Sequence, residues 1–390
     1  ALAFLALLTV IVIVPGRQTA DAASDELSIV TSVDNSAITH GSISNWTLRI
    51  DTAADITLAS GIVVTDTLPD GLCPFGAGDA DCAGGPAPVP AYSSATENAD
   101  GSWTLVWNLP AMNAAEQVVI TYSTETRTHY QESFADDKPV LARDSWINAA
   151  LVTGDVDGSY VSDASTASQA AGGVTVGADV ATRPVALTQP AVCGDGAAMA
   201  WNPTQAAGYR VGDQVCWRLS VDYPVDLTTH GSVVGDALPT GQAFTANDTW
   251  APGAGNTVPL ADIDGSANTS GASSLNWNVG DTGGYVSSGR RFEVVFSTTI
   301  VNPAATWSGQ AVSSVMNHSH STSAGGTIGA SDTAGVTVLE PEIRLLKGVI
   351  EVDGISTGGS ANVDGVDVSE ADLVTYQLSV TNSGDIDATD

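Results

Sequence analysis

The segment Asn45-Trp46-Thr47-Leu48-Arg49-Ile50-Asp51 alternates apolar and polar side chains with a period of two. It returns later in the chain as Cys216-Trp217-Arg218-Leu219-Ser220-Val221-Asp222. A period of two is typical of a half-buried β-strand, with one face on a core and the other in water. Both copies put a Trp first on the apolar face, so we predict two equivalent strands.

Three further blocks recur in the same order. They are Gly61-Ile62-Val63-Val64-Thr65-Asp66-Thr67-Leu68-Pro69-Asp70-Gly71, which returns from Gly231 to Gly241; Leu105-Val106-Trp107-Asn108, which returns from Leu275 to Asn278; and Ile120 to Thr124, which returns from Val294 to Thr298. The four offsets are 171, 170, 170 and 174 residues. Repeats at one spacing indicate a duplicated module, and short strands separated by turns favour a β-sandwich.

A third copy begins near the end of the chain. The segment Val374 to Val380 fits the strand of the Trp46 block, with Tyr376 in place of the Trp, and the chain ends at Asp390 before any Val-Val-x-Asp-x-Leu-Pro strand. We therefore predict an all-β chain of tandem immunoglobulin-like β-sandwich repeats. The repeats would span residues 25–176 and 177–338, and an incomplete third repeat would span residues 339–390 of a natural protein that continues.

The first residues predict export. An unbroken apolar run extends from Ala1 to Val14, Pro15 and Gly16 end it, and Ala20-Asp21-Ala22 has the small-x-small pattern of a cleavage site. The run is short for a membrane span and suits the apolar core of a secretory signal. We interpret residues 1–22 as a truncated signal peptide, with a truncated membrane anchor as the alternative. In both cases the remaining residues lie outside the cytoplasm, in the medium or at the cell surface.

The charge balance excludes several kinds of partner. The chain has 44 acidic against 12 basic residues, a formal net charge of −32. Such a surface repels nucleic acid and anionic lipid headgroups. Membrane contact is expected only through the N-terminal segment or a C-terminal anchor beyond this sequence. The acidity is compatible with bound calcium, with a salty medium, or with solubility alone.

The four cysteines fit an oxidising compartment. Cys73 and Cys82 are nine residues apart, and Cys193 and Cys216 are 23 apart. Because each pair falls within one repeat, the bonds Cys73–Cys82 and Cys193–Cys216 are favoured among the three possible pairings. A metal site is the competing interpretation, but no Cys-x-x-Cys occurs.

These blocks resemble the bacterial surface repeat known as domain of unknown function eleven, or the conserved repeat domain. The resemblance rests on the Val374 to Gly384 strand, on the Val-x-Asp-x-Leu-Pro-x-Gly strands, and on Asn148 to Gly154, which is weakly echoed from Asn317 to His320. It covers nearly all of residues 25–390. It implies extracellular immunoglobulin-like modules of adhesins, stalks and envelope proteins, and it implies no catalytic residues.

Fimbrial domains related to this family form a Lys–Asn isopeptide bond beside a carboxylate. The resemblance places the lysine position at Thr31 in the first repeat and at Lys347 in the third, and the second repeat has no lysine. Lys138 is only ten residues from Asn148 along the same segment. We therefore expect no isopeptide bond in the first two repeats, where disulfides would take over the cross-linking role.

Calcium is the ligand that the sequence favours most among metals, although the pattern is incomplete. Asp155 and Asp157 lie in one acidic Asp-Gly turn, and Asp262 and Asp264 lie in another. Neither completes the Asp-x-Asp-x-Asp-Gly loop that ends in a Glu and wraps a calcium ion. Ordinary Asp-Gly turns are the alternative. His318 and His320 share one strand face and could ligate a metal, or could lie on a solvated strand or loop.

The sequence contains no Gly-Lys-Ser/Thr and no His-Glu-x-x-His. Gly-x-Ser-x-Gly occurs once, from Gly354 to Gly358, but no helical pattern follows it, as the strand-turn-helix of a nucleophile elbow would require. Trp103, Trp107 and Trp277 could stack on sugars, but Trp107 and Trp277 recur in register and are better explained as core anchors. We therefore predict a non-enzymatic extracellular structural or adhesive repeat protein of the bacterial cell surface that needs no cofactor. Its partners would be other surface proteins, the cell wall, or a host or environmental surface. The alternative is a calcium- or carbohydrate-binding accessory region of a larger secreted enzyme.

Overall fold

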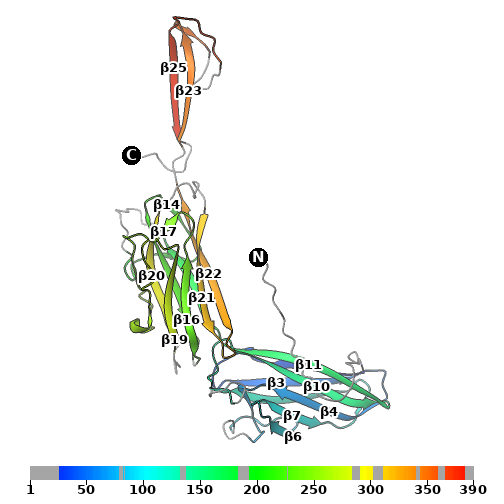
Figure 1. Cartoon of the computed structure of the whole chain (residues 1–390). Coiled ribbons are helices and arrows are strands. Elements are labelled where there is room, and N and C mark those ends of the chain that lie inside the picture. The colour runs from blue at the N-terminus through cyan, green and yellow to red at the C-terminus, as the bar shows by residue number, and fades with distance from the viewer. Residues whose placement is uncertain are drawn as a thin grey trace. The chain divides into compact units, whose positions relative to one another are not determined.

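The computed structural model (Figure 1) describes residues 26–78, 82, 84–131, 138–182, 193–225, 227–282, 290–301, 311–339, 343–358 and 365–382. The signal or anchor predicted over residues 1–22 lies outside these ranges. Within them the chain is built from strands, with a single 3-10 turn at Leu260–Asp262 and no α-helix. No helix in the described part of the chain is long and apolar enough to cross a membrane.

The chain divides into two compact units. One comprises residues up to 137 together with 145–169, and the other comprises 138–144 together with 170 onward. The boundary predicted between residues 176 and 177 lies within one strand, β12 (Thr175–Ala181), which pairs with strands of the second unit.

The first unit is a sandwich of two sheets. The smaller sheet has the order β1-β3-β9-β5, formed by Leu27–Val33, Ile43–Thr52, Gln117–Thr126 and Leu72–Pro74. The larger has the order β2-β11-β10-β4-β7-β6, formed by Ala37–Ile38, Ser159–Ala171, Ser145–Val156, Leu58–Leu68, Trp103–Asn108 and Ser94–Glu97, and β8 (Met112–Asn113) also pairs with β4. The predicted alternation is visible in β3, whose residues are buried and accessible in turn.

The second unit contains a sandwich of the same construction. One sheet has the order β13-β12-β15-β20-β17, formed by Trp201–Asn202, β12, Gln214–Asp222, Arg291–Ile300 and Gln242–Ala243, with β18 (Trp250–Pro252) also on β20. The other has the order β14-β22-β21-β16-β19, formed by Gln205–Tyr209, Thr327–Val338, Ala311–Ser321, Thr229–Ala237 and Ser274–Thr282. The all-β prediction of tandem sandwiches is confirmed.

The repeated sequence blocks pair in the same way in both sandwiches. Trp46 faces Tyr122 across β3 and β9, and Trp217 faces Phe296 across β15 and β20. The Val-x-Asp strand pairs with the second Trp block in each case: Val64 lies opposite Trp107, and Val234 lies opposite Trp277. The repeated sequence blocks therefore form strands that pair with the same register in both sandwiches.

The two cores are organised around four tryptophans, which are among the largest fully buried side chains. They are Trp46 and Trp107 in the first sandwich and Trp217 and Trp277 in the second. The core-anchor interpretation of Trp107 and Trp277 is confirmed, and Trp103 is also buried. Burying a large aromatic side chain contributes roughly 3 kcal/mol, so these residues supply a substantial share of each core.

The Leu-Pro-x-Gly motif forms the same turn twice. Leu72 N donates to Pro69 O at 3.4 Å, and Gln242 N donates to Pro239 O at 3.1 Å. Gly71 and Gly241 have φ values of 90° and 88°. Only glycine adopts this backbone conformation without strain, which explains the motif's last position.

The third repeat consists of a three-stranded sheet, β24-β23-β25, formed by Ile355–Ser356, Ile343–Val352 and Val374–Asn382. Its β23 and β25 pair as β1 and β3 do, because Lys347 lies opposite Leu378 and Thr31 lies opposite Leu48. Apolar side chains of this sheet, including Leu378, are exposed.

Candidate functional site

Two disulfide bonds cross-link loops to strands. The structure joins Cys73 to Cys82, with 6.1 Å between their Cα atoms, and Cys193 to Cys216, with 5.7 Å. These are the pairs that the sequence favoured. All four side chains are buried, and each bond lies within one sandwich. Their role is therefore structural.

A buried carboxyl group lies at the centre of the first sandwich. The hydroxyl of Tyr122 donates to Asp66 Oδ2, and Asn148 Nδ2 donates both to that oxygen at 3.2 Å and to the Tyr122 hydroxyl at 2.7 Å. Burial raises the pKa of Asp66 to about 7, although the hydrogen bonds from Tyr122 and Asn148 lower it. Asp66 Oδ1 and Asn148 Oδ1 have no hydrogen-bond partner.

The second sandwich has the equivalent carboxyl group. Asp236 Oδ2 accepts a hydrogen bond of 2.5 Å from Ser314 Oγ, and burial raises the pKa of Asp236 to about 6. Asp236 lies opposite Leu275 as Asp66 lies opposite Leu105, so the two carboxyls are register equivalents. Both residues belong to the repeated Val-x-Asp motif, but the sequence alone did not identify them as a site. The alternation of the strand could have indicated their burial, because Val64, Asp66 and Leu68 all fall on the inward side of β4.

The first sandwich thus contains the carboxylate and the asparagine of an isopeptide arrangement, but not the lysine. Thr31 occupies the position equivalent to Lys347 and is buried. In the second sandwich Ala178 is the equivalent residue, opposite Leu219. No amine at these positions reaches either carboxyl. In the third sheet, Lys347 Nζ lies 4.2 Å from the centre of the Tyr376 ring.

His318 and His320 are both buried, so the solvated-strand interpretation is wrong. His318 Nε2 lies 2.9 Å from Ser232 Oγ, which in turn lies 2.6 Å from the Tyr223 hydroxyl. His320 Nε2 donates to the carbonyl of Ala142 at 3.2 Å. Burial, with the neighbouring His320 as the second cause, lowers the pKa of His318 to about 4. A Ser–His contact can activate a nucleophile, but Ser232 and His318 are 0% and 2% exposed, so no substrate reaches them.

The predicted calcium candidates serve as turn residues. Asp157 accepts hydrogen bonds from Thr57 N and Leu58 N, and Asp155 accepts one from Gly158 N at the β10–β11 turn. In the second unit, Asp264 accepts one from Ser266 N, and the side chain of Ser266 together with this backbone bond lowers the pKa of Asp264. Asp262 closes the 3-10 turn at Leu260–Asp262. In the described ranges, no group of three or more His, Cys, Asp or Glu side chains is placed to hold a metal ion.

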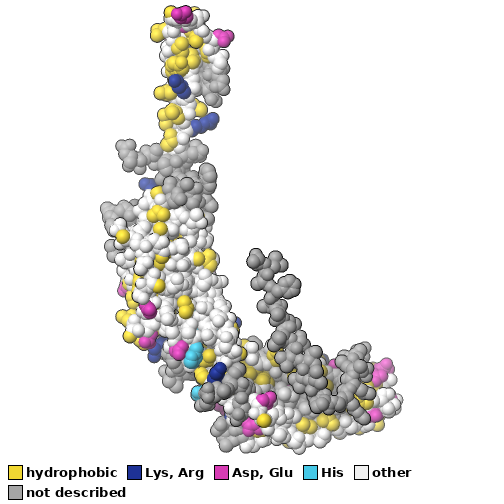
Figure 2. All heavy atoms as spheres, in the orientation of Figure 1, with side chains coloured by type: hydrophobic (Ala, Val, Ile, Leu, Met, Phe, Trp, Pro, Cys, Tyr) yellow, Lys and Arg dark blue, Asp and Glu magenta, His cyan; other side chains and the backbone are white. Residues whose placement is uncertain are grey.

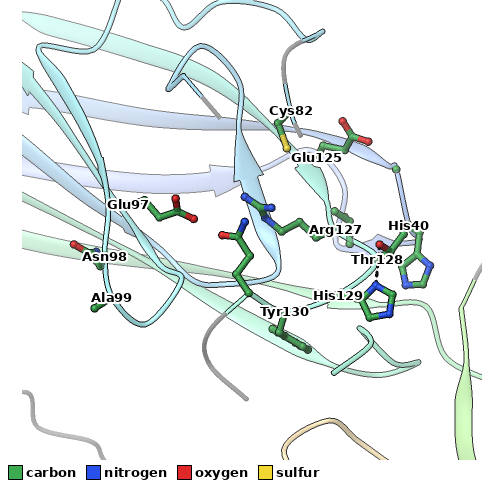
Figure 3. Close-up of a pocket in the computed structure, with 13 residues that line it drawn as sticks. His40, Cys82, Glu97, Asn98, Ala99, Glu125, Arg127, Thr128, His129 and Tyr130 are labelled. Atoms are coloured by element: carbon green, nitrogen blue, oxygen red, sulfur yellow. Dashed lines mark hydrogen bonds between the residues drawn. The ribbon is translucent and has the colours of Figure 1, made fainter. Parts of the chain in front are cut away.

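The first sandwich has an open cleft of about 1220 Å³ at one end of its sheets (Figure 3). Arg127, Glu97 and Gln131 line it, with His40 and His129 at its side. With its amide oriented to satisfy both neighbours, Gln131 accepts from Arg127 Nη1 at 2.7 Å and donates to Glu97. Glu97, Gln131 and Arg127 thus bind one another, and His40, Glu125 and His129 add further polar groups to the lining, so the cleft can contact a polar ligand.

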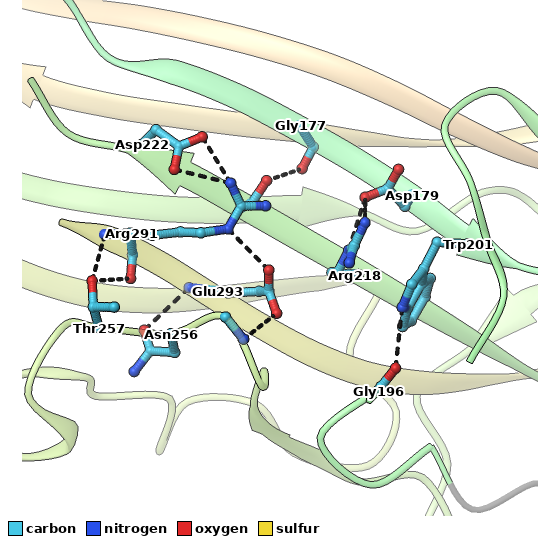
Figure 4. Close-up of polar contacts among 12 residues, drawn as sticks. Gly177, Asp179, Gly196, Trp201, Arg218, Asp222, Asn256, Thr257, Arg291 and Glu293 are labelled. Carbon is cyan, nitrogen blue, oxygen red and sulfur yellow. Dashed lines mark hydrogen bonds and ion pairs between the residues drawn. The ribbon is translucent and has the colours of Figure 1, made fainter. Parts of the chain in front are cut away.

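The β12-β15-β20 sheet carries opposite charges on its outer face (Figure 4). Arg218 Nη2 lies 2.8 Å from Asp179 Oδ2, and the Arg218 guanidinium lies 4.9 Å from the centre of the Trp201 ring. Arg291 bridges Asp222, at 2.8 Å, and Glu293, at 3.0 Å. Cross-strand pairs of this kind stabilise a sheet by a few tenths of a kcal/mol to about 1 kcal/mol each.

No protein-family model and no curated protein matches this chain. The resemblance to the conserved repeat domain therefore stays a prediction. Among solved structures, the chain is similar to the C-terminal domain of the antigen I/II polypeptide BspA of Streptococcus agalactiae, with 9% identity, 78% of this chain and 99% of that chain covered, and a TM-score of 0.30.

Two further solved structures are similar to the same degree. The C-terminal domain of the antigen I/II-family protein AspA of Streptococcus pyogenes has 11% identity over 79% of this chain and 99% of that one, with a TM-score of 0.31. The full-length major pilin SpaD of Corynebacterium diphtheriae has 10% identity over 87% and 72%, also with a TM-score of 0.31. Identities and scores this low carry no argument, so the function proposed below rests on the chain's own residues.

Proposed function

We propose that this chain is a non-enzymatic structural or adhesive repeat region of a bacterial cell surface, acting as a spacer and interaction module. The proposal rests on one observation: the second sandwich has a core built in the same way as the core of the first. Trp46 and Trp217, and Asp66 and Asp236, occupy the same registers. A repeated core whose polar groups are buried serves to hold a shape, because no substrate reaches those groups.

The construction suits a load-bearing role. Strands such as β10 and β22 have 12 residues each and pair over most of their length. A disulfide in each sandwich limits how far its chain extends even when the sheets open. Both features favour a module that keeps its length when it is pulled.

Disulfides also support the proposed location outside the cytoplasm, because cytosolic thiols are kept reduced. The net charge of −32 argues against nucleic acid and anionic membranes as partners. The partners that we propose are neutral or basic surfaces, such as another surface protein, the cell wall, or a host or environmental surface.

A deletion series in the producing bacterium tests this role. Cells would carry the complete protein, or the protein without the second sandwich, and antibody accessibility and attachment to a surface would be measured. If the chain is a spacer, the shortened protein should still be exported and folded but should reach less far from the cell. Attachment of the cells to the surface should then fall, while the protein stays accessible to antibody. Unchanged attachment with a shortened protein would contradict the spacer role.

The cleft in the first sandwich favours a second candidate, a carbohydrate-binding accessory role. Its volume of about 1220 Å³ is large enough for a small ligand, and the exposed His129 and the half-buried Gln131 on its lining can contact a sugar. Binding to a glycan array that is lost in Gln131→Ala, but kept in Gln117→Ala at the exposed start of β9, would support this role. No glycan bound at millimolar concentration would contradict it.

A further inference from the structure

The first sandwich has an unusual distribution of charge between its two outer faces. On the outer face of the β1-β3-β9-β5 sheet, Arg49 and Asp51 form an ion pair of 2.8 Å. On the larger sheet, the outward side chains of β10 are Ser145, Ile147, Ala149, Leu151 and Thr153, which alternate with buried residues. None of them is charged.

The neighbouring strands continue this uncharged face. Register places Leu151 beside Thr65, Thr65 beside Val106, and Val106 beside Ser94. The next row consists of Ala149, Thr67, Thr104 and Thr96, joined by the same three pairings. The charged outward side chain of β10 is Asp155, near the end of the strand, where its carboxylate accepts a hydrogen bond from Gly158 N in the turn. In a chain of net charge −32, a face of five strands without a charge is a distinct surface.

The second sandwich shows the same asymmetry independently. Its β12-β15-β20 sheet carries the ion pairs described above, whereas the outward residues of the β22-β21-β16-β19 sheet are uncharged. Examples are Ser313, Val315 and Asn317 on β21, and Ser331 and Thr333 on β22. Figure 2 shows few charged side chains over β16, β21 and β22. The charges begin at a strand end, with His230 and Asp281.

We propose that the uncharged face of the β11-β10-β4-β7-β6 sheet binds the same face of a second copy of this chain, so that the protein associates laterally. Two copies of net charge −32 repel each other wherever their acids face one another. The uncharged face is where this repulsion is weakest. Its side chains are small, apart from the exposed Ile147, Leu151 and Tyr160, and flat sheets with such faces pack about 10 Å apart.

The size of the face is sufficient for such contact. From the lengths of the five strands and the usual strand spacing, it covers about 700 Å². Specific interfaces bury about 600–1,000 Å² on each partner, so the face lies within this range. A glycan is a poorer occupant, because this face offers little aromatic surface on which a sugar could stack. On its described strands, the exposed aromatic side chain is Tyr160, at the beginning of β11. The proposal goes beyond the spacer function, since a spacer needs no lateral contact.

Sedimentation velocity of the full oxidised chain at micromolar concentrations tests the proposal. We expect reversible dimers that strengthen as salt rises from about 20 to about 500 mM, because salt screens the repulsion between the remaining acids. Leu151→Glu places like charges at the contact and, across a two-fold interface, does so twice. We expect it to weaken association at least about tenfold.

The control is Val119→Glu on the opposite sheet. Val119 is 44% exposed and Leu151 is 41% exposed, so both variants change charge and exposed apolar surface alike. Val119→Glu should leave association unchanged, and circular dichroism should show both variants folded. A monomeric wild-type chain at all concentrations, or equal weakening by both variants, would overturn the proposal. A monomer that binds a glycan through Leu151 would also overturn it.

Discussion

The indole Nε1 of Trp46 donates a hydrogen bond of 3.0 Å to Oγ1 of Thr124, between neighbouring strands of the first core. Trp217 Nε1 makes the same bond to Thr298 Oγ1, at 2.8 Å. Both hydroxyl-bearing residues are 0% exposed. Each repeat thus contains a large aromatic residue whose polar atom is satisfied inside the core, which fixes the orientation of the ring.

Replacing the acceptor should therefore destabilise each sandwich without changing its shape. Thr124→Val keeps the volume but leaves the indole N–H buried and unpaired, which costs about 1–3 kcal/mol. Thr298→Val should cost more, because Thr298 also donates to Gln242 at 2.6 Å. Denaturant unfolding measures both values. Thr121→Val, on the exposed side of β9, is the control and should change stability by less than about 0.5 kcal/mol.

The first sandwich should become less stable as pH rises from about 4 to about 7. The pKa of Asp66 is about 7 in the folded chain and near 3.8 when exposed. The folded state therefore binds the proton more tightly, and its contribution is complete below pH 4 and lost as pH rises through 7. The loss is on the order of 4 kcal/mol. Thermal unfolding of wild type and Asp66→Asn across this range checks it, and the variant should show a flat profile. Stability that rises with pH in the wild type would contradict this assignment.

The second sandwich should depend less on pH over the same range, because its buried carboxyl and its buried histidines act in opposite directions. Asp236, whose folded pKa is about 6, contributes stability that is lost as pH rises from about 4 to 6. His318, whose folded pKa is about 4 against 6.5 when exposed, contributes stability that is lost as pH falls from 6.5 to 4, and His320, whose pKa burial also lowers, acts in the same direction. In the double variant His318→Gln/His320→Gln the Asp236 effect should stand alone, so the melting temperature should fall as pH rises. A double-variant profile as flat as that of the wild type would refute the opposition.

Removing each disulfide should destabilise its own sandwich. The bonds close loops of 9 and 23 residues. Chain entropy then predicts losses of about 2.5 and about 3.5 kcal/mol. The double variants Cys73→Ser/Cys82→Ser and Cys193→Ser/Cys216→Ser, compared by calorimetry, measure this. Reductant should shift the wild-type transitions by the same amounts and should leave a chain that lacks all four cysteines unaffected.

The architecture could be predicted from the sequence because short local patterns determine which side chains of a strand face inward and where the strand ends. Alternation around Trp46 and Trp217, and the Leu-Pro-x-Gly turns, determine which side chains face inward and where strands end. The disulfides could be favoured because each pair lies within one repeat. The Asp66, Tyr122 and Asn148 cluster could not be recognised in the same way, because its members come from three strands and meet only when the two sheets pack.

The burial of the histidines could not be predicted for a related reason. His318 and His320 lie in a stretch of small polar residues, and their neighbours come from distant segments: Ser232 beside His318, and the carbonyl of Ala142 beside His320. The same holds for the part that Asp157 plays in its turn, because its carboxylate accepts from backbone amides at Thr57 and Leu58, about a hundred residues away in sequence. Such long-range hydrogen bonds leave no local trace in the sequence.

The central claim is that the two disulfide-linked sandwiches are separate modules, each of which unfolds in a single step. Single-molecule force extension of the full chain tests this claim most directly. We predict two discrete unfolding events in oxidising buffer. Reduction should lengthen them by the closed loops of 9 and 23 residues, which is about 30 Å and about 80 Å of extended chain. Gradual extension without discrete events, or events whose lengths do not change on reduction, would contradict the account.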